Sequence, residues 1–174
     1  MRNLIEFILE KLSYDGTTPK NKYELKSLID KRIKENKDAD LNDIDVSKVT
    51  DMSKLFTCDP HNIKIDKWNV SNVTNMDQMF YFCENFNCDL GNWKVKNEKS
   101  MKSMFMGCSK FEGKGLENWD VHNVQNMQSM FSLCNSLDCN LKDWNVLKVD
   151  NMMCMFNQCD SMKELPEWYT KDYL

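Results

Sequence analysis

A unit of about 25 residues recurs along most of this chain, and it limits what the chain can fold into. Aligned on tryptophan, the copies begin at Trp68, Trp93, Trp119 and Trp144, and a degenerate copy begins at Ile44. Most copies follow the spacing W-x-V-x-x-V-x-x-M-x-x-M-F-x-x-C. One unit is too small to bury its own apolar side chains, so neighbouring units must stack on a shared core. The sequence therefore predicts a repeat fold over residues 44–167.

Two periodicities within the unit predict a strand followed by a helix. Trp93 and Val95 would share one face of a strand, with Lys94 on the other, because side chains alternate along a strand. The later Met-x-x-Met-Phe-x-x-Cys stretch has the spacing of an amphipathic helix. The residue before the first Met would cap that helix, and it is Asp51, Asn75, Ser100, Asn126 or Asn151. We expect an α/β fold, a leucine-rich-repeat-like right-handed solenoid of about five strand–helix coils.

The ends of such a stack need covers, because open edges pair with other chains. At the N-terminus, Asn3 with Glu6 and Asn21 with Glu24 each have the spacing of a capping box before an amphipathic run. These boxes predict a two-helix cap over residues 1–40, ahead of a repeat solenoid over 41–167. Residues 168–174 form the predicted C-terminal cap, an aromatic lid that contains Trp168, Tyr169, Tyr173 and Leu174.

Charge and hydropathy set the expected partners and location. The net charge is −4 and the pI is about 5.3, so the chain has no basic face with which to bind nucleic acid. Charged residues interrupt the apolar N-terminal run, which argues against a signal peptide and against membrane insertion. We expect a cytoplasmic protein, or one at the cell surface or secreted if a leader was removed or if export is non-classical.

The cysteines and histidines favour packing over chemistry. Cys83, Cys108, Cys134 and Cys159 recur once per unit beside apolar neighbours, as buried free thiols do. The two histidines lie in different units, and no C-x-x-C pair accompanies them, so no metal and no cofactor are expected. Cys58 with His61 would be a nucleophile and base only if an orienting group and an oxyanion site were present. We expect no catalytic residues.

The candidate partner-binding surface is the outward face of the predicted strands. Solenoids commonly present such a face to partners. Glu98 is a second kind of candidate, because it replaces the valine of the other units and would need either exposure or a partner such as Lys96 or Lys99. The candidate residues are Lys67, Asn69, Asn92, Lys94, Glu98, Asn118, Asp120, Asp143, Asn145 and Tyr169.

The repeat resembles a known family. The segments WNVSNVTNMDQMF, WDVHNVQNMQSMF and DVSKVTDMSKLF are similar to the repeat of the BspA-like leucine-rich-repeat surface proteins of bacteria. The preceding KYELKSLIDKRIKENKDADLNDID is similar to the segment found ahead of such repeats. The resemblance implies a right-handed leucine-rich-type solenoid that acts in surface adhesion or host interaction, and it implies no catalytic residue.

Three functional hypotheses follow. The first is a non-enzymatic repeat module that binds a protein partner in adhesion or host contact. The second is a cytoplasmic effector or inhibitor that blocks an enzyme by covering its surface. The third is a thiol-dependent enzyme, which would require Cys58 to be far more reactive than the cysteines of the repeat.

Overall fold

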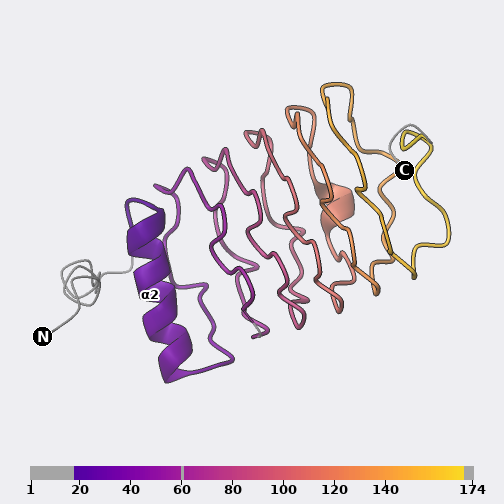
Figure 1. Ribbon diagram of the computed structural model, residues 1–174. Coiled ribbons are helices and arrows are strands. Elements are labelled where there is room, and N and C mark those ends of the chain that lie inside the picture. The colour runs from indigo at the N-terminus through magenta and orange to yellow at the C-terminus, as the bar shows by residue number, and fades with distance from the viewer. Residues whose placement is uncertain (1–17, 60, 171–174) are drawn as a thin grey trace, which may run out of the picture.

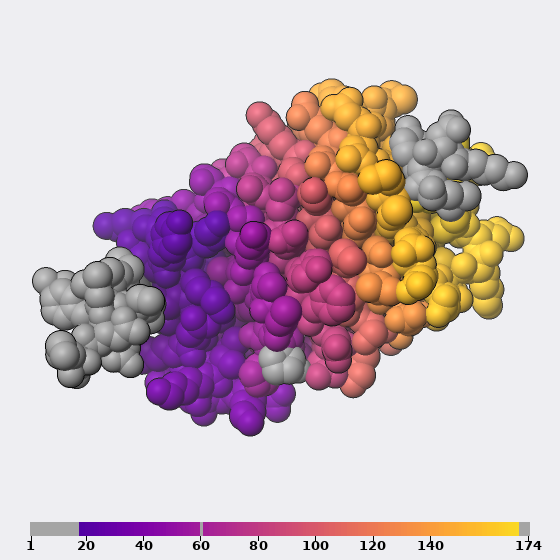
Figure 2. Space-filling model, viewed as in Figure 1, coloured from indigo at the N-terminus to yellow at the C-terminus, as the bar shows by residue number. Residues whose placement is uncertain are grey.

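Successive units lie side by side in a stack that runs from a helix at one end to the C-terminal segment at the other (Figure 1). The computed structural model describes residues 18–59 and 61–170. Within them the regular elements are helix α2, Lys22–Glu35, and a short 3₁₀ helix, Leu116–Asn118. No β-strand occurs in this part of the chain; neighbouring units share isolated parallel bridges such as Asp51 with Asn75. In the space-filling view the colours follow one another in bands, so each unit reaches the surface (Figure 2).

The predicted α/β class, with five strand–helix coils, is therefore wrong. The Met-x-x-Met-Phe-x-x-Cys stretch folds as two consecutive tight turns, closed in the second unit by bonds from Met79 N to Met76 O and from Cys83 N to Phe80 O. Residues three and four apart share a face in such turns as they do in a helix, so the apolar spacing does not separate the two structures. The Trp-x-Val segment alternates inward and outward as expected, but it also ends in turns.

A recurring left-handed residue prevents helix formation in each unit. In the first unit, Lys54 has φ 59° and Cys58 has φ 57°, and the other units repeat this at the same two positions. A residue in this conformation breaks the α-helix, which requires negative φ throughout. The equivalent of Cys58 in the third unit is Gly107, for which a positive φ costs little.

The backbone amides freed in this way bond to the next unit. Met52, Lys54, Phe56 and Cys58 donate to the carbonyls of residues 75, 77, 79 and 81, and each later junction repeats the four bonds. The N···O distances at these four junctions lie between 2.7 and 3.1 Å. We call this set the amide ladder. All of its N–H groups point toward the C-terminal end of the stack.

Aromatic and sulfur columns fill the core. Stacked indoles run from Trp93 through Trp119 and Trp144 to Trp168, with centroids 6.3–6.4 Å apart. A phenylalanine column runs beside it, one ring per unit, with centroids 5.4–5.7 Å apart. Each indole N–H donates to the carbonyl three residues before the start of the preceding unit, as Trp119 does to Leu90 at 3.0 Å. Burial of the rings and satisfaction of their polar atoms together fix the register of the units.

The polar residues predicted to cap repeat helices instead begin turns. The side chains of Asp51, Asn75, Asn126 and Asn151 each accept a hydrogen bond from the amide two residues ahead, at 2.8–3.1 Å. Asx turns of this kind use the same residue types as helix N-caps, so the residue type alone does not reveal which structure forms.

Helix α2 covers the N-terminal end of the stack (Figure 1). Its cap is the predicted one, because Asn21 accepts from Tyr23 N and Glu24 N while Glu24 accepts from Lys20 N. Leu25, Leu28 and Ile29 join the core. The helix expected after Asn3, together with Tyr173 and Leu174 of the expected lid, lies outside the described residues.

Candidate functional site

Two rows of exposed side chains flank the tryptophan column. Because the indoles from Trp93 to Trp168 stack on one another, the residues before and after these tryptophans also line up along the stack, and the unit that begins at Trp68 has the same sequence pattern. Eight of the ten predicted partner-binding residues are exposed and stand in these rows. They are Lys67, Asn92, Asn118 and Asp143 in the row before tryptophan, and Asn69, Lys94, Asp120 and Asn145 in the row after it. The rows carry lysines near α2 and aspartates toward the C-terminal end.

Part of the second row also shapes its own backbone. Asn69, Asp120 and Asn145 each accept from the amide two residues ahead, so these side chains are held in fixed positions. His122 Nδ1 also lies 2.6 Å from the Asp120 carboxylate, and this hydrogen bond lowers the pKa of Asp120. Lys94 has no such bond and extends from the surface. The second row therefore combines fixed acceptors with a movable cation.

The other two predicted site residues are buried. Tyr169 is 7% exposed and its ring meets Phe156 edge to face. Glu98 is 0% exposed: one carboxylate oxygen accepts from the Lys99 and Ser100 amides, and the other has no hydrogen-bond partner. Neither Lys96 nor Lys99 pairs with it through an ammonium group in the described part of the chain. Neither side chain can reach a partner on the outward rows without a rearrangement.

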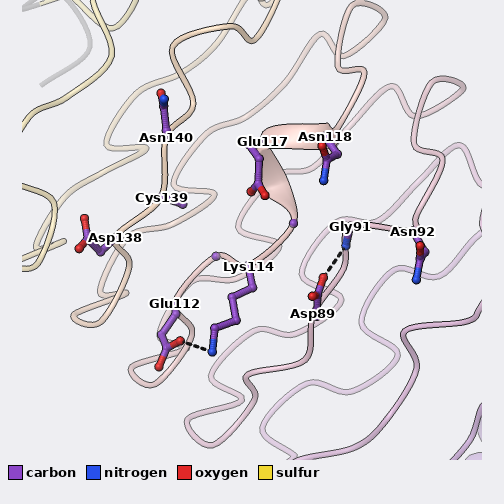
Figure 3. A pocket seen from close by; sticks show the side chains of 12 residues that line it. Asp89, Gly91, Asn92, Glu112, Lys114, Glu117, Asn118, Asp138, Cys139 and Asn140 are labelled. Carbon is purple, nitrogen blue, oxygen red and sulfur yellow. Dashed lines mark hydrogen bonds and ion pairs between the residues drawn. The ribbon is translucent and has the colours of Figure 1, made fainter.

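A hollow of about 630 Å³ opens beside the first row, along the return loops of the second, third and fourth units (Figure 3). Asn92 and Asn118 belong to both the row and the hollow. The hollow carries more acid than base. Its charged lining residues are Asp89, Glu112, Lys114, Glu117 and Asp138. Lys114 pairs with Glu112 at 2.6 Å, and this contact lowers the pKa of Glu112 and raises that of Lys114.

The floor of the hollow is a glycine contact. Gly115 has φ 87°, and a Cβ there would lie 2.1 Å from Gly91 N. Only a residue without a side chain allows the two units to approach this closely. In the sequence the unit that begins at Trp93 is one residue longer than its neighbours and contains Gly113 and Gly115, but this pattern does not indicate a hollow.

Gly115→Ala should therefore lower the free energy of unfolding by roughly 3 kcal/mol or more, because the new methyl group meets backbone and takes a disfavoured φ. Gly91→Ala is the matched control, since its Cβ would come no closer than 3.2 Å to any atom. Urea unfolding followed by tryptophan fluorescence measures both. Equal losses in the two variants would contradict this account of the contact.

The repeat cysteines are packing residues, as predicted. Cys83, Cys108, Cys134 and Cys159 are buried and free, and each donates its S–H to a phenylalanine carbonyl of the preceding unit at 2.8–3.0 Å. Burial raises the pKa of Cys83 and of Cys159 to about 12. These thiols are not poised as nucleophiles.

Cys58 differs from the repeat cysteines because it is exposed. Beside it, His61 Nδ1 lies 2.7 Å from the Asp59 carboxylate. Asp59 can therefore orient this histidine, which was not predicted from the sequence. The structure gives no hydrogen bond between Cys58 and His61.

Thiol labelling should separate these classes. A maleimide should modify Cys58 within minutes at pH 7, while the four repeat cysteines react only through unfolding, at least 100-fold more slowly. Mass spectrometry of tryptic peptides over time measures the order. Rapid labelling of Cys108 in the folded chain would contradict its burial.

No group of three or more His, Cys, Asp or Glu residues is placed to hold a metal ion in residues 18–59 and 61–170. In the same residues, no helix has the length and apolar character needed to cross a membrane.

The comparisons with known proteins place the chain in a repeat family. Residues 24–115 and 99–173 match, as two overlapping segments, a family described as Mycoplasma protein of unknown function, DUF285. The chain belongs to the DUF285 family. Curated proteins yield no match, and neither do solved structures. Membership of DUF285 agrees with the sequence resemblance only at the coarse level of a surface-repeat family, and it does not extend to the BspA-like proteins themselves.

The DUF285 match spans the stack and most of α2, so it includes both rows and the hollow.

One exposed apolar residue of the last unit was not predicted from the sequence. Leu147 is 92% exposed and stands where the other units have Ser47, Ser71, Lys96 and His122. An alignment of the units shows it, because leucine is the one apolar residue at a position that is otherwise polar.

Proposed function

We propose that this chain is a non-enzymatic protein-binding repeat module that acts in adhesion or host contact, and that the rows beside the tryptophan column bind the partner. The observation that carries the proposal is the alignment of eight exposed side chains along a stack that fixes their spacing. Rigid presentation reduces the entropy lost on binding.

Charge separation along the rows favours one orientation of the partner. Lys67 and Lys94 lie toward α2, whereas Asp120 and Asp143 lie toward the other end. A partner with the opposite gradient is guided into register, with a larger effect on association rate than on affinity. The aligned amides of Asn92 and Asn118 add hydrogen-bond donors and acceptors between the charged ends.

The double variant Lys94→Glu with Asp120→Lys should weaken partner binding at least tenfold, because it reverses one charge in each half of the gradient without changing net charge. The matched control is Lys110→Glu with Glu84→Lys, an exposed pair on the return loops. The wild type and both variants are immobilised and used to capture proteins from extracts of the native source, from serum and from cell extracts. The affinity of each captured partner is then measured by titration. Unchanged binding by the Lys94→Glu and Asp120→Lys variant would show that the partner does not bind the rows.

Location is tested separately. Adhesion requires that the protein be accessible outside the cell, so protease treatment of intact cells should degrade it while a cytoplasmic marker survives. Complete protection from the protease would favour an intracellular partner.

A further inference from the structure

The junction between the second and third units differs from the other junctions of the stack. Here the first bond of the amide ladder, from Met76 N to Ser100 O, spans 3.1 Å, against 2.8–2.9 Å at the other three junctions. Isolated parallel bridges at the same position join the other units, but none joins Asn75 to Ser100 among the described residues. The indole column begins at Trp93, and in the same part of the chain Trp68 does not stack on it. Several contacts that recur along the stack are therefore longer or missing at this one place.

Glu98 accounts for a further difference at this junction. It is fully buried, whereas Val73 and Val124 occupy the equivalent positions of the second and fourth units. Its Oε1 accepts from the Lys99 amide at 3.2 Å, so this amide does not bond to Thr74 O as its equivalents bond to the preceding unit elsewhere. Its Oε2 has no hydrogen-bond partner among residues 18–59 and 61–170. The valine column therefore gives the carboxyl group neither a counter-charge nor a full set of hydrogen bonds.

A second carboxyl group lies near Glu98 on the other side of the junction. Asp77 of the second unit accepts from the Ser100 hydroxyl at 2.5 Å and from the Lys102 amide at 2.9 Å. The Ser100 amide also donates to Glu98 at 3.3 Å, so this serine bonds a carboxyl group of each unit. The negative charge of Asp77 disfavours ionisation of Glu98. When Glu98 loses its proton, two like charges meet across the junction.

The other charged groups of this region do not neutralise Glu98. They are Lys96, Lys99 and Lys102 of its own unit, and their ammonium groups form no ion pair with it in the described part of the chain. Separation of the two units would bring the carboxylate into contact with water, which favours the charged form. Loss of the proton and opening of the junction therefore promote each other.

We propose that the junction between the second and third units is a pH-controlled opening point, at which the two units separate when Glu98 gives its proton to water while the stack stays closed on both sides. This opening occurs within the folded chain and is distinct from unfolding of the whole stack. It moves Lys67 and Asn69 relative to Asn92 and Lys94, so the rows keep their alignment only while Glu98 is protonated.

Amide hydrogen exchange of the full chain, measured by NMR at pH 6 and pH 8.5 and corrected for the intrinsic rate of each amide, tests the proposal. Protection of the ladder amides that cross this junction should fall at least about tenfold between the two pH values, because the pKa of Glu98, about 8 in the closed stack, returns toward 4.5 when the group is hydrated. Protection at the junctions on either side should change less than about twofold. The amides that cross the junction are those of Met76, Gln78, Phe80 and Phe82, and the comparison amides are those of Met52, Lys54, Phe56, Met101, Ser103 and Phe105.

Two substitutions of Glu98 separate its ionisation from its packing. Glu98→Val should make the four amides as well protected as the comparison amides at both pH values. Glu98→Gln keeps a buried polar group without a charge, so protection should stay below that of the valine variant and should not depend on pH. An equal fall at all three junctions of the wild type would overturn the proposal, because the stack would then open only by unfolding as a whole. A fall in Glu98→Gln as large as that in the wild type, or none in the wild type, would also overturn it.

Discussion

Glu98→Val should raise the free energy of unfolding by about 3 kcal/mol at pH 8, because it removes a buried carboxyl group. Glu98 is fully buried, and one of its carboxylate oxygens is unpartnered. Burial raises its pKa to about 8, and the bonds from the Ser100 and Lys99 amides only partly oppose this. Valine occupies the equivalent site in every other unit, so the cavity already has the shape for it.

The substitution should also restore a missing bond between units. At the other junctions the residue after valine donates to the preceding unit, as Thr74 N does to Thr50 O and Gln125 N to Lys99 O, both at 2.9 Å. Lys99 N is instead turned to the Glu98 carboxylate. With valine present, we expect Lys99 N to bond Thr74 O.

The pH dependence gives the decisive measurement. The folded-state pKa of about 8 lies above the ordinary value of 4.5, so the folded chain binds the proton more tightly than the unfolded chain. The stability that this group contributes is complete below pH 4.5 and falls as pH rises through 8, in total by about 5 kcal/mol. Above pH 8 the loss is constant.

Urea unfolding of the wild type, Glu98→Val and Glu98→Gln between pH 4.5 and pH 8.5 tests this account. The two variants should lose the decline that the wild type shows, and the glutamine variant, which keeps a buried polar group, should be less stable than the valine variant. His61 and His122 are present in all three proteins, so their contribution cancels in the comparison. Parallel curves for the wild type and Glu98→Val would disprove the burial of an uncompensated carboxyl.

The repeat could be predicted from the sequence, but the structure within the repeat could not. Trp93, Val95 and the Met, Phe and Cys positions are buried as their periodicity indicates. The choice between a helix and two tight turns depends on φ at positions such as Lys54 and Gln78, which are exposed or half-buried and of ordinary residue types. Their left-handed conformation is imposed by bonds to the next unit, and no single unit contains that information.

The candidate site likewise has a part that the sequence predicts and a part that it does not. Lys94 and Asp120 are exposed because they alternate with buried neighbours, a pattern visible in one unit. The amide ladder depends on the direction of hydrogen bonds between units, and side-chain periodicity carries no information about that direction. For Glu98 the sequence left two alternatives, exposure or a lysine partner, and both are wrong: the side chain is buried, and only the backbone amides of Lys99 and Ser100 bond to it among the described residues.

Phe105→Ala should lower the free energy of unfolding by about 4 kcal/mol, because it removes a buried ring from the middle of the stack. Phe105 is 0% exposed, and its ring centroid lies 5.4 Å from Phe80, 4.4 Å from Phe111 and 5.7 Å from Phe131. Collapse around the cavity is limited, since the amide ladder fixes the spacing of the units.

The matched control is Phe156→Ala, the same truncation in the last unit. Phe156 is 6% exposed, with ring contacts to Phe131, Trp168 and Tyr169 and no full unit beyond it among the described residues, so the loss should be about half as large. Hydrogen exchange distinguishes the two variants further. In a stack stabilised by contacts between neighbouring units, Phe105→Ala should speed hydrogen exchange of the ladder amides on both sides of it, including Gln78 and Ser129. Phe156→Ala should speed exchange of Ser129 and Leu133 and leave the Gln78 amide protected. Equal loss of protection throughout the chain in both variants would mean that the stack unfolds as one unit and that no end is weaker than the middle.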